Sequence, residues 1–124
     1  RPDENATHLY HLVDLAHVDL ILELWPSLLD SSLKWRAQDE NFATYWPGRS
    51  VGDGEIKSNM SIVEVDTLVR ASTRPYPGAY ILLDKETELI IWKGTTEYKE
   101  NTHCIQCLDG VYYALDYELK TVNK

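Results

Sequence analysis

Residues 70–80 have the sequence RASTRPYPGAY, and this stretch decides the fold because a helical pattern ends in it and a strand pattern follows it. Upstream, Ser61 and Glu64 have the spacing of a capping box, in which a hydroxyl and a carboxylate satisfy free N–H groups at the start of a helix. Apolar residues then recur at helical spacing, at Ile62, Val65, Leu68 and Val69. Two prolines and a glycine in the quoted stretch end that helix. We therefore predict a short amphipathic helix that turns a corner into a sheet.

The part of the chain after the corner has the pattern of two β-hairpins. Residues 79–83 and 88–93 flank a polar connection, and residues 102–108 and 111–119 flank Asp109-Gly110, a strong short hairpin signal. In the last strand, larger apolar residues at odd positions alternate with Tyr112, Ala114, Asp116 and Glu118. One face of the sheet is therefore expected to be core and the other partly solvent and partly contact surface. So small a sheet needs a helix or a partner chain over its apolar side.

The part of the chain before the corner begins with a second helical pattern. Asn5 or Thr7 can cap a helix that carries an apolar stripe as far as Leu24, and Pro26 is expected to break it before a further turn at residues 27–29. Several polar residues on this helix have metal-ligand chemistry, namely His8, His11, Asp14 and His17. They lack the spacing of a known zinc motif, so a solvated polar face is favoured and no metal site is expected.

A long connector separates the two helical patterns. It is punctuated by glycine and proline, and it contains four large aromatic residues, Trp35, Phe42, Tyr45 and Trp46. These aromatics argue against disorder. We favour the interpretation that they pack the connector onto the domain beneath, and the alternative is that they form the wall of a ligand site.

Composition limits the classes of function. The 124 residues contain 12 Lys+Arg and 20 Asp+Glu, which gives a formal net charge of −8 and disfavours a nucleic-acid partner. No apolar run approaches the ~18 residues that a membrane-spanning helix needs, and no basic leader precedes an apolar segment, so a cytoplasmic protein is expected.

The spelling C-x-x-C occurs once, at Cys104 and Cys107. In a strand, positions three residues apart point to opposite faces, and this pair precedes a turn, whereas the redox motif opens a helix. We therefore interpret both residues as reduced cysteines of a strand.

Several of these segments together resemble the formyltransferase family, which includes methionyl-tRNA formyltransferase and the sugar N-formyltransferases. The sequence VRA at 69–71 followed by PYPGAY at 75–80 is the most specific part of the resemblance. Other pieces follow in the family's order, namely QDE at 38–40, ATYW at 43–46 and DGEI at 53–56. The resemblance covers most of residues 7–117.

The resemblance implies an α+β fold made of three parts. Residues 1–30 resemble the terminal helix of a formyltransferase-type catalytic domain, residues 31–60 form the aromatic connector, and residues 61–124 form a short helix with a small antiparallel sheet of two hairpins, a truncated OB-like C-terminal region. Arg49 falls where the family's crossing segment carries an arginine near the active-site mouth. The resemblance thus makes Arg49, Tyr45 and Trp46 the expected substrate-binding residues.

The resemblance also implies what the chain does and does not contain. Full-length members move a formyl group from 10-formyltetrahydrofolate to an amine by means of an Asn, a His and an Asp, all N-terminal to the segment that this chain resembles. We therefore expect no catalytic residue, no bound cofactor and no activity in this chain alone. It begins without Met, and two alternatives stay open: a C-terminal portion of a formyltransferase, or the same region reused as a non-catalytic binding or dimerisation module.

Substrate class and assembly complete the expectations. The tRNA branch of the family carries a fuller basic C-terminal domain, so the acidic tail here favours a nucleotide-linked amino sugar over a methionyl-tRNA formyltransferase-like function. Large aromatic residues crowd the two hairpins, namely Trp92, Tyr98, Tyr112, Tyr113 and Tyr117. They indicate either a homodimer formed through this β-tail, the pairing that sugar N-formyltransferases commonly show, or rings that cover the short helix of the same chain.

Overall fold

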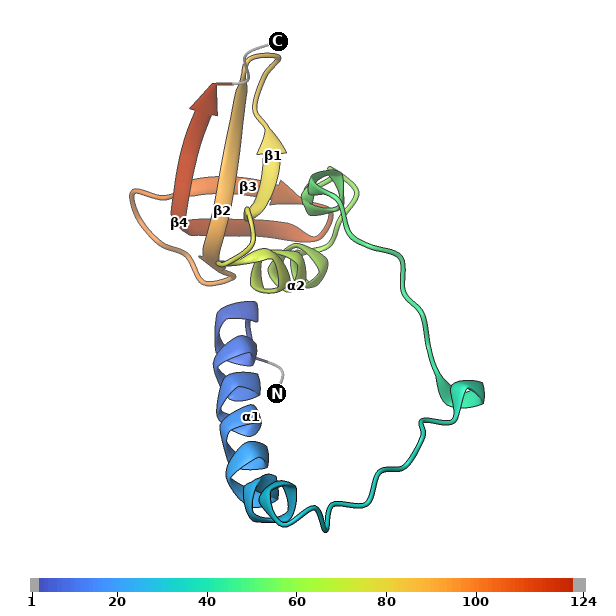
Figure 1. Cartoon of the computed structure of the whole chain (residues 1–124). Coiled ribbons are helices and arrows are strands. Elements are labelled where there is room, and N and C mark those ends of the chain that lie inside the picture. Colours follow the sequence, from blue (N-terminus) through green and yellow to red (C-terminus); the bar gives the residue numbers. More distant parts are fainter. Residues whose placement is uncertain (1–2, 122–124) are drawn as a thin grey trace. The chain divides into compact units, whose positions relative to one another are not determined.

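The computed structural model describes residues 3–121, and their helices and strands follow the order expected of an α+β chain (Figure 1). The helical elements are α1 (Ala6–Leu29), two short 3₁₀ turns η1 (Glu40–Phe42) and η2 (Val51–Gly54), and α2 (Ile62–Ser72). The strands are β1 (Ala79–Leu82), β2 (Thr87–Thr95), β3 (His103–Cys107) and β4 (Gly110–Thr121). The chain divides into two compact units, and residues 9–49 form one of them. The other unit combines residues 3–8 with residues 50–121.

The four strands form one antiparallel sheet in the order β1-β2-β4-β3. Both predicted hairpins are confirmed, and the pairing of β2 with β4 joins them into one sheet. The second turn differs by one residue, because Cys107 pairs with Gly110 and the loop is Leu108–Asp109. The sheet also contains an irregularity: the register passes from Ile91 opposite Tyr117 to Lys93 opposite Asp116, so that Trp92 is an extra residue in β2.

The core lies between α2 and the sheet. The predicted apolar face of α2 is confirmed, since Val65 and Val69 are buried while Ile62 and Leu68 pack at the edge of the core. The sheet contributes buried side chains from every strand, namely Ala79, Leu89, Ile91, Ile105, Cys107, Tyr112 and Ala114. The inward face of β4 is thus the one with Tyr112 and Ala114, and this tyrosine lies inside the domain.

The capping box of α2 is confirmed and is reinforced by the second hairpin. The backbone N–H of Ser61 donates to Glu64 Oε2 over 2.8 Å, and that of Glu64 donates to Ser61 Oγ over 3.3 Å. Asp109, in the β3–β4 turn, accepts the N–H of Ile62 over 2.7 Å. The turn therefore caps the first residue of α2, and this long-range contact ties the hairpin to the helix.

Helix α1 begins where the sequence predicts but does not break at Pro26. Asn5 caps it, because Asn5 Oδ1 accepts the N–H of His8 over 2.9 Å. Beyond Pro26 the helix continues to Leu29, and the N–H of Asp30 donates to the Pro26 carbonyl over 3.1 Å. The predicted break is wrong because proline removes only its own N–H from the helical ladder, and the following turn keeps its bonds.

The connector aromatics have little contact with the rest of their own unit, residues 9–49. Trp35, Phe42, Tyr45 and Trp46 expose 84%, 83%, 85% and 88% of their surface. The interpretation that they pack the connector onto a domain stays a prediction. Local polar contacts shape the segment: Asp39 accepts the N–H of Asn41 over 3.0 Å and caps η1.

Two smaller expectations also have an outcome. Cys104 is exposed and Cys107 is buried, which confirms that the two lie on opposite faces of β3, and both are free thiols. No helix within residues 3–121 has the length and apolar character needed to cross a membrane.

Candidate functional site

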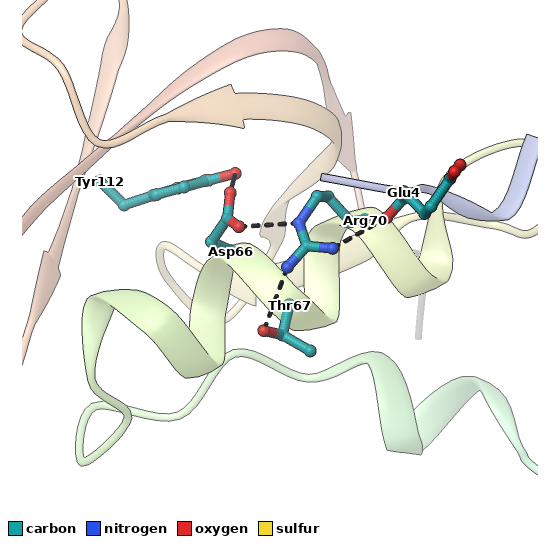
Figure 2. A network of polar contacts seen from close by, with 5 residues as sticks. All are labelled: Glu4, Asp66, Thr67, Arg70 and Tyr112. Carbon is teal, nitrogen blue, oxygen red and sulfur yellow. Dashed lines mark hydrogen bonds and ion pairs between the residues drawn. The ribbon is translucent and has the colours of Figure 1, made fainter. Parts of the chain in front are cut away.

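A network of polar side chains joins α2, β4 and the segment before α1 (Figure 2). The Tyr112 hydroxyl donates to Asp66 Oδ1 over 3.2 Å, and Arg70 Nε donates to Asp66 Oδ2 over 2.8 Å. A second arm of the guanidinium, Arg70 Nη1, donates to the backbone carbonyl of Glu4 over 2.8 Å. Arg70 Nη2 also contacts Thr67 Oγ1 over 3.4 Å. These five residues are the docking network, and they connect positions separated by more than sixty residues of sequence.

Local structure explains how the docking network forms. Asp66 and Arg70 are four residues apart on α2, so their side chains lie on the same face of the helix, with the acidic residue on the N-terminal side as the favoured pairing requires. Tyr112 reaches them because its ring lies over Gly94 in β2. A Cβ atom at position 94 would lie 2.6 Å from Tyr112 Cζ, so no side chain fits there.

Electrostatics keep the Tyr112 hydroxyl a hydrogen-bond donor. Burial, and then the charge of Asp66, raise the pKa of Tyr112 far above its ordinary value of 10.0. The hydroxyl, the carboxylate and the guanidinium are thus engaged with one another. Such a set holds chain segments in place, and it does not offer a base to a substrate.

A second cluster surrounds the corner loop between α2 and β1. Arg74 Nη1 donates to Asp116 Oδ2 over 2.5 Å, and the guanidinium carbon lies 4.3 Å from the centre of the Trp92 ring. The Asp116 contact raises the pKa of Arg74 above its ordinary value. Because both partners lie where the β2–β4 register shifts, the irregularity in the sheet presents them to the loop.

The corner loop itself is built closely against β2. Its Arg74–Pro75 peptide bond is cis, and the N–H of Gly78 donates to the Ser72 carbonyl over 3.0 Å. Gly78 has a φ of +99°, and a Cβ there would lie 2.7 Å from Ile90 Cγ2, so this position requires glycine.

The N-terminal segment contacts the same unit at several points. The Thr7 hydroxyl donates to the backbone carbonyl of Arg74, and Ala6 is only 9% exposed. Glu4 pairs with His8 through its side chain while its carbonyl accepts from Arg70. Residues 3–8 are therefore packed as part of the C-terminal unit.

The comparison with known families fits this unit. The model of the family described as "Formyl transferase, C-terminal domain" matches residues 50–117. The chain belongs to this family. The match contains η2, α2, the corner loop and nearly all of the sheet, and it confirms the resemblance carried by the sequence of residues 70–80. Full-length formyltransferases use formyl-tetrahydrofolate as the donor of the formyl group.

The substrate-binding residues predicted from sequence lie outside residues 50–117, the part of the chain that matches the formyl transferase C-terminal domain. Tyr45, Trp46 and Arg49 belong to the unit of residues 9–49, and Arg49 is the residue just before the match begins. Tyr45 donates its hydroxyl to Glu40 Oε2 over 3.1 Å. The two rings share one stretch of chain with Arg49, and their exposure shows that no described residue covers them.

The docking network was not predicted from sequence. The spacing of Asp66 and Arg70 on the predicted helix, and an isolated glycine in a strand at position 94, were the available signals. The polar residues of α1 that raised the metal hypothesis are exposed, and among residues 3–121 no group of three or more His, Cys, Asp or Glu is placed to hold a metal ion.

Proposed function

We propose that this formyl transferase C-terminal domain serves a cytoplasmic sugar N-formyltransferase, in which a catalytic half moves the formyl group of 10-formyltetrahydrofolate to the amine of a nucleotide-linked sugar. The charge of the C-terminal unit carries the choice of substrate. Ion pairs with its own carboxylates engage both of its described arginines and one lysine, in the pairs Arg70–Asp66, Arg74–Asp116 and Lys120–Glu88. The whole chain has a net charge of −8. Such a surface is unsuited to a tRNA, whose binding depends on neutralised phosphates.

The connector supplies groups suited to a nucleotide. Tyr45 and Trp46 expose their ring faces, on which a base can stack, and Arg49 follows them with a guanidinium whose fork matches phosphate oxygens. Stacking and a bidentate contact would hold the nucleotide, while the catalytic half acts on the amino group of the sugar.

The experiment is a formyl-transfer assay on the natural protein together with the catalytic half that it carries or recruits. We expect transfer to a nucleotide-linked amino sugar, and no transfer to methionyl-tRNA. In the same assay, Arg49→Ala should raise KM for the sugar nucleotide about tenfold or more, because a charged contact contributes about 1.5–3 kcal/mol. Arg36→Ala, in the same connector, is the control and should leave KM unchanged. Efficient, salt-sensitive formylation of methionyl-tRNA would refute the proposal.

We also propose that the β-tail pairs two copies of the chain, with a smaller set of residues than the sequence suggested. Tyr112 is excluded, because it is 0% exposed. The exposed apolar residues that remain on or beside the sheet include Tyr98, Leu108, Leu115 and Leu119. Tyr98 stands edge-on to Tyr113 with the ring centres 5.7 Å apart, which gives this surface a rigid aromatic pair. Light scattering tests the pairing: a monomer at every concentration up to high micromolar would refute it.

A further inference from the structure

We propose that α2 carries a recognition site for the chain segment that starts α1, and that this site keeps residues 3–8 bound even when the connector is cut. The family match begins at residue 50, yet residues 3–8 pack in the same compact unit as residues 50–121. The C-terminal domain of this protein is on this view discontinuous in sequence, with residues 9–49 inserted into it. The inference does not depend on the substrate proposed above.

The site is assembled before the segment arrives. Asp66 holds Arg70 Nε over 2.8 Å, and the Tyr112 hydroxyl holds Asp66 over 3.2 Å from the opposite side. Tyr112 is in turn fixed by full burial over Gly94. All of these contacts are made within residues 50–121, so the free Nη1 arm of Arg70 is already aimed when the Glu4 carbonyl reaches it. A preorganised donor binds with a small entropic cost.

The segment is recognised mainly through its backbone and its small side chains. Arg70 binds a main-chain carbonyl of the segment, and the Thr7 hydroxyl binds a main-chain carbonyl of the corner loop. Between these two contacts, Ala6 is only 9% exposed, so this position has no room for a large side chain. The partner that fits is therefore a helix start with a small residue in its first turn, a hydroxyl one residue later and a free carbonyl just before the cap.

Residues 3–8 also have local contacts of their own that hold them in the conformation bound by the site on α2. Asn5 caps α1 by accepting the N–H of His8 over 2.9 Å, and the Glu4 side chain pairs with His8 across the same turn. These local contacts stabilise the helix start independently of α2. Two preformed surfaces thus meet, which is the condition under which a short segment binds without a covalent tether.

The test cuts the connector in the folded protein. A recognition site for a specific protease is inserted into the exposed connector between Leu33 and Asp39, and the full-length protein is cleaved after folding. Sedimentation velocity then measures whether the N-terminal piece remains bound to the C-terminal piece at about 50 µM. We expect the two pieces to sediment together, and we expect Arg70→Ala to weaken their association about tenfold or more, since it removes a charged hydrogen bond. Arg36→Ala is the matched control and should leave the pieces together.

A second variant and a second measurement guard against misfolding. Ala6→Leu leaves the contacts among Asp66, Arg70 and Tyr112 intact and alters the segment alone, and it should also release the N-terminal piece. In the uncut protein, hydrogen exchange at the amide of His8, which donates to Asn5, should quicken in both variants, while Leu89 and Ile91 in β2 stay protected. If Arg70→Ala also speeds hydrogen exchange in β2, that variant has lost more than the contact with the segment, and the Ala6→Leu variant then tests the proposal. Separation of the wild-type pieces, or their retention in the deciding variants, would overturn the proposal.

Discussion

Replacing Gly94 by alanine is the sharpest test of the packing described for this domain. A Cβ at position 94 would lie 2.6 Å from Tyr112 Cζ and 2.7 Å from its hydroxyl oxygen, and Tyr112 has no exposed surface through which to move away. The ring must therefore shift or the strands must part. Either movement also separates the Tyr112 hydroxyl from Asp66.

The expected cost follows from those two effects. Overpacking a core costs about 1–3 kcal/mol and loss of a hydrogen bond to a charged partner about 1.5–3 kcal/mol, so the free energy of unfolding should fall by about 2.5–6 kcal/mol. For a domain of this size, in which each kcal/mol shifts Tm by about 4–8 °C, that corresponds to a decrease in Tm of at least about 10 °C. Urea denaturation followed by circular dichroism and tryptophan fluorescence measures it.

Two comparisons isolate the cause. Gly48→Ala is the matched control, because a Cβ at position 48 has no atom within 4 Å, and it should change stability by at most about 1 kcal/mol. Tyr112→Leu removes the ring that Gly94 accommodates, so Gly94→Ala should cost much less in that background. A Gly94→Ala protein within about 0.5 kcal/mol of wild type, or an equal cost with and without the ring, would refute the reasoning.

Other expected outcomes concern the caps and the corner loop. Asp109→Ala removes the acceptor for the N–H of Ile62 and should lower the free energy of unfolding by about 1 kcal/mol, measured by urea denaturation with the exposed Glu97→Ala as control. The pKa of Glu64 is lowered by hydrogen bonds from the backbone and then the side chain of Ser61; a carboxyl with a lowered folded-state pKa stabilises the fold above its ordinary value of 4.5 and loses this effect as the pH falls through the folded-state pKa. Thermal unfolding of Glu64→Gln should therefore depend less on pH below about 4.5 than that of wild type, and an unchanged slope would contradict the assignment. Arg74→Ala removes the cation over the Trp92 ring and should change the emission of that tryptophan, whereas Arg36→Ala should not.

Local signals in the sequence were enough for most of the fold. The start of α2 was predictable because Ser61 and Glu64 form their contacts within one turn, and the hairpins because short polar connections separate alternating strands. The turn lies at Leu108–Asp109, one residue before the predicted position, and Asp109 caps Ile62 from a distance, which the sequence did not indicate. Tertiary contacts of that kind cannot be predicted from the spacing of residues within one segment.

The candidate site was less predictable for the same reason. Tyr112 was grouped with the other hairpin aromatics, for which a dimer surface and a cover over the short helix were both left open, and its contact with Asp66 shows that it covers the helix. The signal that it points inward is Gly94 in the neighbouring strand β2, which leaves room for its ring. The contact between Arg70 and Glu4 uses a backbone carbonyl, which every residue possesses, so no residue type marks it. The connector rings were expected to pack because bulky aromatics are usually buried, and that expectation stays a prediction for the exposed rings of residues 9–49.

The insertion of residues 9–49 between two parts of one compact unit has a consequence for how such a protein can change over evolutionary time. Within the inserted segment, the connector after α1 is the flexible part, and the entropic cost of closing a flexible loop grows only logarithmically with its length, about 0.6 kcal/mol for each doubling. The connector can therefore lengthen, shorten or acquire new side chains while the sheet and α2 stay folded. A lineage could in this way exchange the exposed aromatics of the connector for other side chains without first stabilising a new domain.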